Sequence, residues 1–308
     1  MLEVNLSGLN LKSPIILASG ILGVSYSSMK RVIDAGAGAV TTKSIGPKPR
    51  KGYKNPSIIE IYSGTFLNSV GLGNPGINEF IYEIKEFKKH DIPLIVSVFG
   101  DTEENYLNVA IKAENAGADA IEINISCPHA EVSSIGIDKD LTYKLVKYIK
   151  QKLKIPLFVK LNPNVTDIIE IGLAAQKGGA NGVVAINTCS ALKIDVNTKR
   201  PILSHGSGGL SGKAIHPIAI KKVFDLYKVL KIPVIGCGGI DSWQDVIEFF
   251  LAGASAVQIG TALYKGTEII QEINDGIIQY LKDNGSSTIN EIKGLAHKFK
   301  IQEAPDFD

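Results

Sequence analysis

The sequence predicts an α/β fold in which eight parallel strands alternate with helices in a (β/α)8 TIM barrel. Two short patterns support this prediction because they recur and strictly alternate along the chain. One is a proline followed by an apolar run, and the other is Gly-Ala-x-small followed by an apolar run. Each segment is short, rich in β-forming residues and bounded by Gly or Pro, which is typical of a buried parallel strand.

Each pattern predicts four of the eight strands. Proline fits the first residue of a strand, and its segments are SPIILASG (13–20), IPLIVSVFG (92–100), IPLFVKLN (155–162) and IPVIGCGG (232–239). Gly-Ala fits the turn after a helix, and its segments are GAGAVTTK (36–43), GADAIEIN (117–124), GANGVVAIN (179–187) and GASAVQIG (253–260). The chain is therefore expected to alternate strand and helix around one barrel.

The segments between the strands have helical periodicity. Apolar residues recur every three to four positions in residues 77–90, 103–116, 140–153 and 167–178. Thr166, and either Asp241 or Ser242, are expected N-caps. The competing interpretation is a doubly wound open sheet, but the count of eight and the lack of an edge strand favour the barrel.

One domain covering residues 1–308 is expected, with a short N-terminal hairpin and two insertions. Residues 44–77 follow the second strand and residues 191–217 follow the sixth. Insertions that follow barrel strands lie at the face where barrel enzymes carry their active sites. The two insertions are therefore expected to cover the functional site.

Composition narrows the class of protein. The chain has 308 residues, 44% of them hydrophobic, and a net charge of +2, which argues against binding to nucleic acid or a membrane surface. The three cysteines, Cys127, Cys189 and Cys237, form neither a disulfide framework nor a CxxC metal site. No signal peptide or membrane-spanning segment is evident, so a cytoplasmic protein is expected. No bound metal is expected either.

Polar side chains end several otherwise apolar strands. Lys43, Asn124, Lys160 and Asn187 lie at such ends, which suits a planar, hydrogen-bonding and partly anionic ligand. Glycines in GCGGI (236–240) and IGTAL (259–263) end the last two strands, where barrels commonly bind phosphate. GGLSG (208–212) could supply further backbone amides.

Three residues have more than one interpretation. Lys160 could stabilise negative charge on a reduced flavin or form a Schiff base, and Lys43 could pair with a carboxylate or a phosphate. Cys127 begins a loop after a strand, so it is either a small buried side chain or a general base. Cys237, among glycines, is expected to pack in the interior.

Several motifs resemble one enzyme family along nearly the whole chain. They are TKS (42–44), FLNSVGLGNPG (66–76), NISCP (124–128), VKLNPN (159–164), INT (186–188), GGLSG (208–212) and GCGGI (236–240). Together they resemble class 1 dihydroorotate dehydrogenases, most closely the catalytic subunit of the 1B type. The resemblance implies an FMN-binding barrel that oxidises (S)-dihydroorotate to orotate in de novo pyrimidine biosynthesis, with hydride passing from C6 to N5 of FMN.

The resemblance also implies roles for individual residues. Cys127 would be the base that removes a proton from C5. The positions that match the family's substrate contacts are Lys43, Asn68, Gly71, Leu72, Asn124, Asn187 and Thr188. The positions that match its FMN contacts are Ala18, Ser19, Gly20, Lys43, Ser44, Asn124, Lys160, Ile186, Ser211, Gly212, Gly238, Gly239, Gly260 and Thr261.

The 1B resemblance implies a separate partner subunit carrying FAD and a [2Fe–2S] cluster, which passes electrons to NAD. The assembly would be a homodimer core or a heterotetramer, whereas the 1A pattern would be a homodimer that uses fumarate. The chain departs from the family at His129, at Ser97 and in the loop at residues 130–138, which lacks a double glycine. His129 also fits a dihydropyrimidine (dihydrouracil/uracil) dehydrogenase, and a non-redox phosphate-binding barrel is the further alternative.

Overall fold

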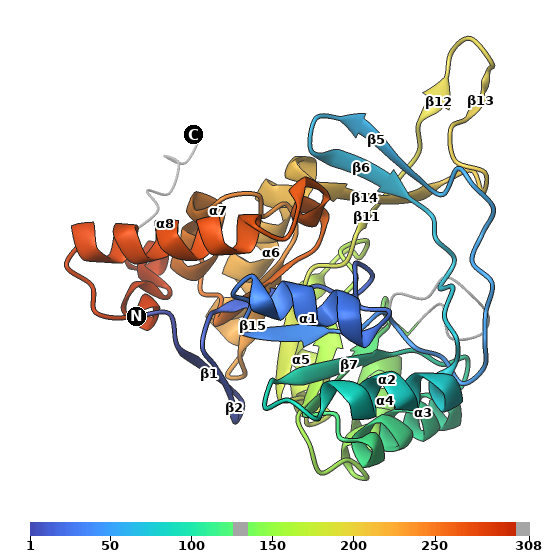
Figure 1. The fold of residues 1–308 in the computed structure, drawn as a ribbon, viewed down its shortest axis with the longest axis horizontal. Helices are drawn as coiled ribbons and strands as arrows, with labels where there is room; N and C mark the ends of the chain where they lie inside the picture. The colour runs from blue at the N-terminus through green and yellow to red at the C-terminus, as the bar shows by residue number, and fades with distance from the viewer. Residues whose placement is uncertain (126–134, 300–308) are drawn as a thin grey trace, which may run out of the picture.

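The eight predicted strands form one closed barrel in the computed structural model, which describes residues 1–125 and 135–299 (Figure 1). The barrel order is β10-β15-β16-β3-β4-β7-β8-β9, and every neighbouring pair is parallel. The strands are β3 (Ile15–Leu17), β4 (Ala39–Thr41), β7 (Leu94–Val98), β8 (Ala120–Asn124), β9 (Leu157–Lys160), β10 (Gly182–Ala185), β15 (Val234–Cys237) and β16 (Ala256–Ile259). The predicted barrel is confirmed.

Helices cover the outside of the barrel (Figure 1). They are α1 (Tyr26–Asp34), α2 (Ile77–Phe87), α3 (Glu103–Ala116), α4 (Lys139–Lys150), α5 (Ile168–Lys177), α6 (His216–Val229), α7 (Trp243–Leu251) and α8 (Ile269–Asp283). Four short 3-10 helices are η1 (Lys213–Ile215), η2 (Thr261–Lys265), η3 (Ile289–Ile292) and η4 (Leu295–Lys298). Because the strands are covered on their outer side and packed within, most of their residues are buried.

Local capping explains where two of the helices begin. Ser242 caps α7, as expected, and forms a capping box with Asp245. The predicted cap of α5 is wrong by one residue: Asp167, not Thr166, accepts a hydrogen bond from the Ile169 backbone N–H at 2.7 Å. A carboxylate that accepts from the first turn also interacts favourably with the helix dipole.

The expected N-terminal hairpin is present as β1 (Val4–Leu6) and β2 (Leu9–Leu11), paired antiparallel. The Ser7 hydroxyl donates to the Asn181 carbonyl at 2.6 Å, just before β10 begins. The hairpin therefore lies at the N-terminal end of the barrel strands, away from the ends where the polar residues were found.

The two insertions meet in a sheet that the sequence did not predict. A four-stranded antiparallel sheet has the order β11-β14-β6-β5, with β5 (Ile58–Tyr62) and β6 (Thr65–Asn68) from the first insertion. The second insertion supplies β11 (Cys189–Ala191), β14 (Gly208–Gly212) and the small hairpin of β12 (Ile194–Asp195) and β13 (Arg200–Pro201). Figure 1 shows this sheet standing over one end of the barrel. Of the described helices, none is long and apolar enough to cross a membrane.

Candidate active site

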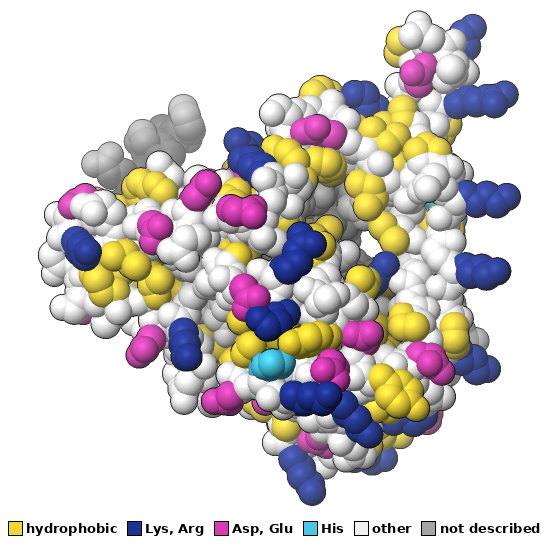
Figure 2. Space-filling view, in the orientation of Figure 1, with side chains coloured by type: hydrophobic (Ala, Val, Ile, Leu, Met, Phe, Trp, Pro, Cys, Tyr) yellow, Lys and Arg dark blue, Asp and Glu magenta, His cyan; other side chains and the backbone are white. Residues whose placement is uncertain are grey.

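A cavity of about 430 Å³ lies between the C-terminal ends of the barrel strands and the four-stranded sheet. Figure 2 shows the molecular surface hollowed between the barrel and this sheet, with hydrophobic side chains around the hollow. Its volume is in the range of pockets that hold small ligands and cofactors. The position is the one at which barrel enzymes carry their active sites.

Nearly all the predicted site residues line this cavity. All the positions expected to contact FMN line it: Ala18, Ser19, Gly20, Lys43, Ser44, Asn124, Lys160, Ile186, Ser211, Gly212, Gly238, Gly239, Gly260 and Thr261. Of the positions expected to contact substrate, those that line it are Lys43, Asn68, Leu72, Asn124, Asn187 and Thr188. Cys127 and His129 lie outside the described residues.

Gly71 is the one described site residue that does not line the cavity. Its φ is +75°, and a Cβ there would lie 2.8 Å from the Tyr53 ring, so only glycine fits at this position. The next residue, Leu72, lines the cavity with φ +56°, a conformation that is uncommon for a non-glycine residue. Such strain clusters at functional sites.

Lys43 presents a cation to the cavity. Burial lowers the pKa of its ammonium group from the usual 10.5. Among the residues that the structure describes, no acceptor lies within hydrogen-bond distance of this nitrogen. A half-buried ammonium of this kind is stabilised when an anion or a carbonyl oxygen binds beside it.

A wall of amides and hydroxyls joins several strand ends. Ser44 is at its centre, with its Oγ 2.9 Å from Ser97 Oγ, 3.3 Å from Ser19 Oγ and 3.1 Å from Asn124 Nδ2, which donates to it. Asn187 Nδ2 in turn donates to Asn124 Oδ1 at 3.4 Å. These contacts hold the polar side chains in fixed orientations toward the cavity.

Lys160 lies on the floor of the cavity and is almost fully buried. Its ammonium donates to Gln258 Oε1 at 2.6 Å and to Cys237 Sγ at 3.1 Å. Cys237 therefore lines the cavity and contacts Lys160, whereas the sequence led us to expect a packed interior residue. A side chain at the last residue of a strand turns toward or away from the barrel axis according to the register, which only the fold determines.

The loop after β15, residues 238–241, is shaped to bind an anion. Gly238 and Gly239 have φ values of +131° and +72°, and both line the cavity. The backbone N–H groups of Gly239 and Ile240 find no acceptor within residues 1–125 and 135–299. Successive free N–H groups in such a turn form a concave anion site.

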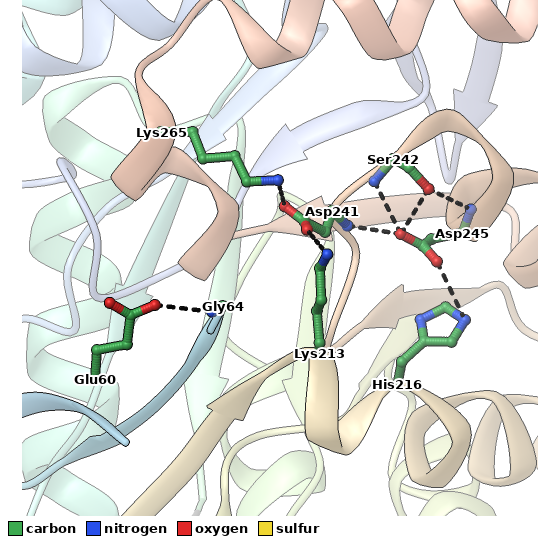
Figure 3. Close-up of polar contacts among 8 residues, drawn as sticks. All are labelled: Glu60, Gly64, Lys213, His216, Asp241, Ser242, Asp245 and Lys265. Carbon is green, nitrogen blue, oxygen red and sulfur yellow. Dashed lines mark hydrogen bonds and ion pairs between the residues drawn. The ribbon is translucent and has the colours of Figure 1, made fainter. Parts of the chain in front are cut away.

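Charged residues hold this loop in place (Figure 3). The Asp241 carboxylate lies 2.7 Å from Lys213 Nζ in η1 and 2.5 Å from Lys265 Nζ in η2. Burial alone would raise the pKa of Asp241, but the hydrogen bonds from both lysines outweigh it and lower the pKa. Asp245 accepts from the backbone N–H groups of Asp241 and Ser242 at 2.8 Å.

The other contacts drawn in Figure 3 support the same end of the barrel. In this view His216 points toward Asp245, with Nε2 3.8 Å from Asp245 Oδ1. His216 Nε2 also lies 2.8 Å from Oε2 of Glu248, a residue not drawn there, and the two contacts join the start of α6 to α7. On the sheet side, Glu60 Oε1 accepts from the Gly64 backbone N–H at 2.8 Å and closes the turn between β5 and β6. These contacts stabilise the α6–α7 side of the cavity and the sheet that contains β5 and β6.

The sequence analysis missed several residues that line the cavity. Two are polar side chains inside barrel strands, Glu122 and Gln258, and their signal was a polar residue in an otherwise apolar run. The others are apolar or aromatic residues, among them Ile58, Phe66 and Tyr264, for which no signal in the sequence distinguishes cavity from core. In the described ranges, no group of three or more His, Cys, Asp or Glu could hold a metal ion.

The fold and the site define a (β/α)8-barrel protein with a preformed cavity, lined by two lysines and several glycines, at the C-terminal ends of its strands. The chain belongs to the dihydroorotate dehydrogenase family, because the model of the family described as "Dihydroorotate dehydrogenase" matches residues 1–281. The match confirms the resemblance that we inferred from the sequence motifs.

Individual relatives agree with the family assignment. The chain is 52% identical over 301 residues to "Dihydroorotate dehydrogenase B (NAD(+)), catalytic subunit" of Pyrococcus horikoshii, covering 97% of this chain and 98% of the relative. It is 50% identical over 305 residues to the protein of the same name from Methanocaldococcus jannaschii, covering 97% and 99%. The 1B type is therefore confirmed over the 1A type.

A solved structure supports the fold. A chain of the crystal structure of DHODH in complex with ferulenol from Eimeria tenella aligns with a TM-score of 0.85 and 23% identity, covering 97% of this chain and 89% of that chain. At this level of identity the likeness supports the barrel fold only.

Proposed function

We propose that this protein oxidises (S)-dihydroorotate to orotate in de novo pyrimidine biosynthesis, with FMN held in the cavity at the end of the barrel. The carrying observation is that one cavity contains a buried lysine on its floor, a second, half-buried lysine and a glycine loop. Among the described residues, neither the second lysine nor the N–H groups of Gly239 and Ile240 have an acceptor. These are the groups that a phosphorylated ring cofactor and a carboxylate substrate require.

The residues present fit FMN. The N–H groups of Gly239 and Ile240, which have no acceptor in the described part of the chain, suit a phosphate together with Gly260 and Thr261. Ser19, Ser44 and Asn124 supply the side-chain donors and acceptors of the polar wall. The remaining FMN contacts that we propose are Ala18, Gly20, Lys43, Lys160, Ile186, Ser211, Gly212 and Gly238.

Bound FMN supplies the ring that accepts a hydride from C6 of the substrate. Lys160, on the cavity floor, places a positive charge where negative charge develops on reduction. Cys127, which lies outside the described residues, follows Asn124 by three positions and removes the proton from C5.

The substrate carboxylate and pyrimidine are held by residues from both insertions and the barrel. Lys43 compensates the carboxylate, and Asn124 and Asn187 present amides from the polar wall. Asn68 belongs to the sheet, where its Nδ2 donates to the Gly209 carbonyl at 3.0 Å. Gly71, Leu72 and Thr188 complete the substrate contacts that we propose.

We also infer that a second chain takes the electrons onward. The relatives are named as catalytic subunits of NAD(+)-linked enzymes, and the motifs resemble the 1B type. The partner would carry FAD and a [2Fe–2S] cluster, around a homodimer core or in a heterotetramer. We also propose that the enzyme works in the cytoplasm, the location expected from the sequence.

Steady-state assays with dihydroorotate and with dihydrouracil test the proposed function. Purified protein should show flavin absorption, and dihydroorotate alone should be turned over. Turnover of dihydrouracil only would favour the dihydropyrimidine alternative. Protein that neither carries nor binds FMN would instead support a non-redox phosphate-binding barrel. Copurification with an untagged second chain, assayed for FAD and iron, tests the partner.

A further inference from the structure

Four polar side chains inside the barrel take the place of the usual apolar layer at the base of the cavity, and three of them line it. Thr41, Glu122, Lys160 and Gln258 come from β4, β8, β9 and β16 and are 0%, 1%, 5% and 1% exposed. Barrel interiors are commonly filled by Val, Ile and Leu. Because burying polar and charged groups is costly, their presence here requires a compensating role.

Gln258 connects the two charged members of this layer. Its Oε1 accepts from the Lys160 ammonium at 2.6 Å, and its Nε2 donates to Glu122 Oε2 at 2.6 Å and to Thr41 Oγ1 at 3.3 Å. This amide orientation is the only one in which both charged neighbours are satisfied, since an ammonium only donates and a carboxylate only accepts. The amide dipole therefore lies head to tail between cation and anion.

Glu122 is incompletely satisfied for a fully buried carboxylate. Its Oε1 has no hydrogen-bond partner among the described residues, while Oε2 is held by Gln258. Buried polar atoms are nearly always paired, so an unpaired carboxylate oxygen calls for an explanation, and a redox role is one that fits a cavity-lining residue. Glu122 and Lys160 both line the cavity, so the charge of each acts on whatever binds there.

We propose that Glu122 and Gln258 are positioning residues for Lys160 and set the reduction potential of the bound flavin. Gln258 fixes the ammonium on the cavity floor, and the negative charge of Glu122 partly offsets its positive charge. Glu122 thereby limits how strongly the site favours the reduced, negatively charged ring. This inference rests on the proposed function, because it takes FMN as the occupant of the cavity.

The test measures the midpoint potential of FMN bound to three isosteric or near-isosteric variants. Glu122→Gln removes the negative charge and should shift the equilibrium about tenfold toward reduced flavin, which is a rise of about 30 mV for a two-electron couple. Gln258→Met removes the amide that holds the Lys160 ammonium against the cavity floor and should lower the potential. Glu122→Asp keeps the charge and should leave the potential close to that of the unaltered protein.

Glu86→Gln is the matched control, because it also removes one carboxylate charge but on the exposed surface of α2, where Glu86 pairs with Lys89. It should leave the potential unchanged. A purely structural role predicts altered thermal unfolding with an unchanged potential in both Glu122→Gln and Gln258→Met, and that result would overturn the proposal. If Glu122→Gln does not fold, the potential of Gln258→Met alone tests the proposal. Failure of the unaltered protein to bind FMN would refute the proposed function instead.

Discussion

The carboxylate of Asp241 lies 2.7 Å from the ammonium of Lys213 and so joins the glycine loop after β15 to η1. Lys265 from η2 approaches the same carboxylate at 2.5 Å. Removing a largely buried carboxylate that is held by two cations is expected to destabilise this end of the barrel more than removing one partner of an exposed ion pair does. The first prediction follows from the pKa of this group.

Asp241→Asn should lower the free energy of unfolding at neutral pH by about 1–3 kcal/mol. The folded-state pKa of Asp241 is below its usual 3.8, so its contribution is fully present above pH 3.8 and is lost as pH falls through the lower folded value. Urea unfolding at several pH values should show the difference between variant and unaltered protein narrowing in acid. Asp34→Asn, in an exposed pair with Lys30, should have little effect at any pH.

Lys43→Met should stabilise the apoprotein and weaken orotate binding by about 10–100-fold. Burial lowers the folded-state pKa of Lys43 below its unfolded value of 10.5, so the cost of burying the charge is full at neutral pH. That cost is relieved as pH rises from the lowered value toward 10.5, and stability rises across this window. The variant should lack this rise. Lys89→Met, at an exposed site, should change neither property.

Cys127→Ala should reduce turnover about 10²–10⁴-fold while FMN stays bound, because only the base is removed. Activity of the unaltered enzyme should rise with pH as the thiol loses its proton. The control is Cys189→Ala in β11: burial raises the pKa of that thiol, and it does not line the cavity. Near-normal turnover in Cys127→Ala would reject the assignment of the base.

Asn74→Ala should raise the KM for dihydroorotate about tenfold or more without releasing FMN. The Asn74 side chain accepts from the backbone N–H groups of Gly46 and Gly76 at 3.1 and 2.8 Å and donates to the Leu72 carbonyl at 2.8 Å. Removing it frees the loop that presents Leu72 to the cavity. Asn78→Ala, nearby and exposed on α2, is the control. Equal effects on substrate and FMN would contradict a role specific to this loop.

Gly239→Ala should weaken FMN binding and cost about 1–3 kcal/mol of stability. Its φ is +72°, and the added Cβ would lie 2.6 Å from the Cβ of His216 and 2.7 Å from its backbone. Gly285→Ala tests the dihedral strain alone, because φ is +69° there and no atom of the described residues lies within 4 Å of the added Cβ. Fluorescence titration of apoprotein with FMN and thermal unfolding separate the two effects. Equal losses in both variants would mean that the contact with His216 is unimportant.

The eight strands, the four analysed helices and the positions of both insertions could be predicted from the sequence. Local sequence signals predict these elements: prolines and Gly-Ala pairs mark the start of strands, and apolar residues recur with a period of 3.6 in helices. Helix caps were less certain because neighbouring residues such as Thr166 and Asp167 can serve equally, and local geometry decides between them. Strand ends also predicted most of the cavity, since the ends of parallel strands meet at one face.

The four-stranded sheet and the floor of the cavity depend on contacts between segments that are distant in the sequence. Asn68 and Gly209 are 141 residues apart and pair across the unpredicted sheet, while Lys160 and Gln258 are 98 residues apart and meet on the cavity floor. The sequence by itself determined that a barrel forms and which residues end its strands. Only the tertiary structure decided that Cys237 faces Lys160 and that Glu122 and Gln258 complete a charged layer. The physical reason is that side-chain direction and register depend on how the barrel closes, which no local pattern contains.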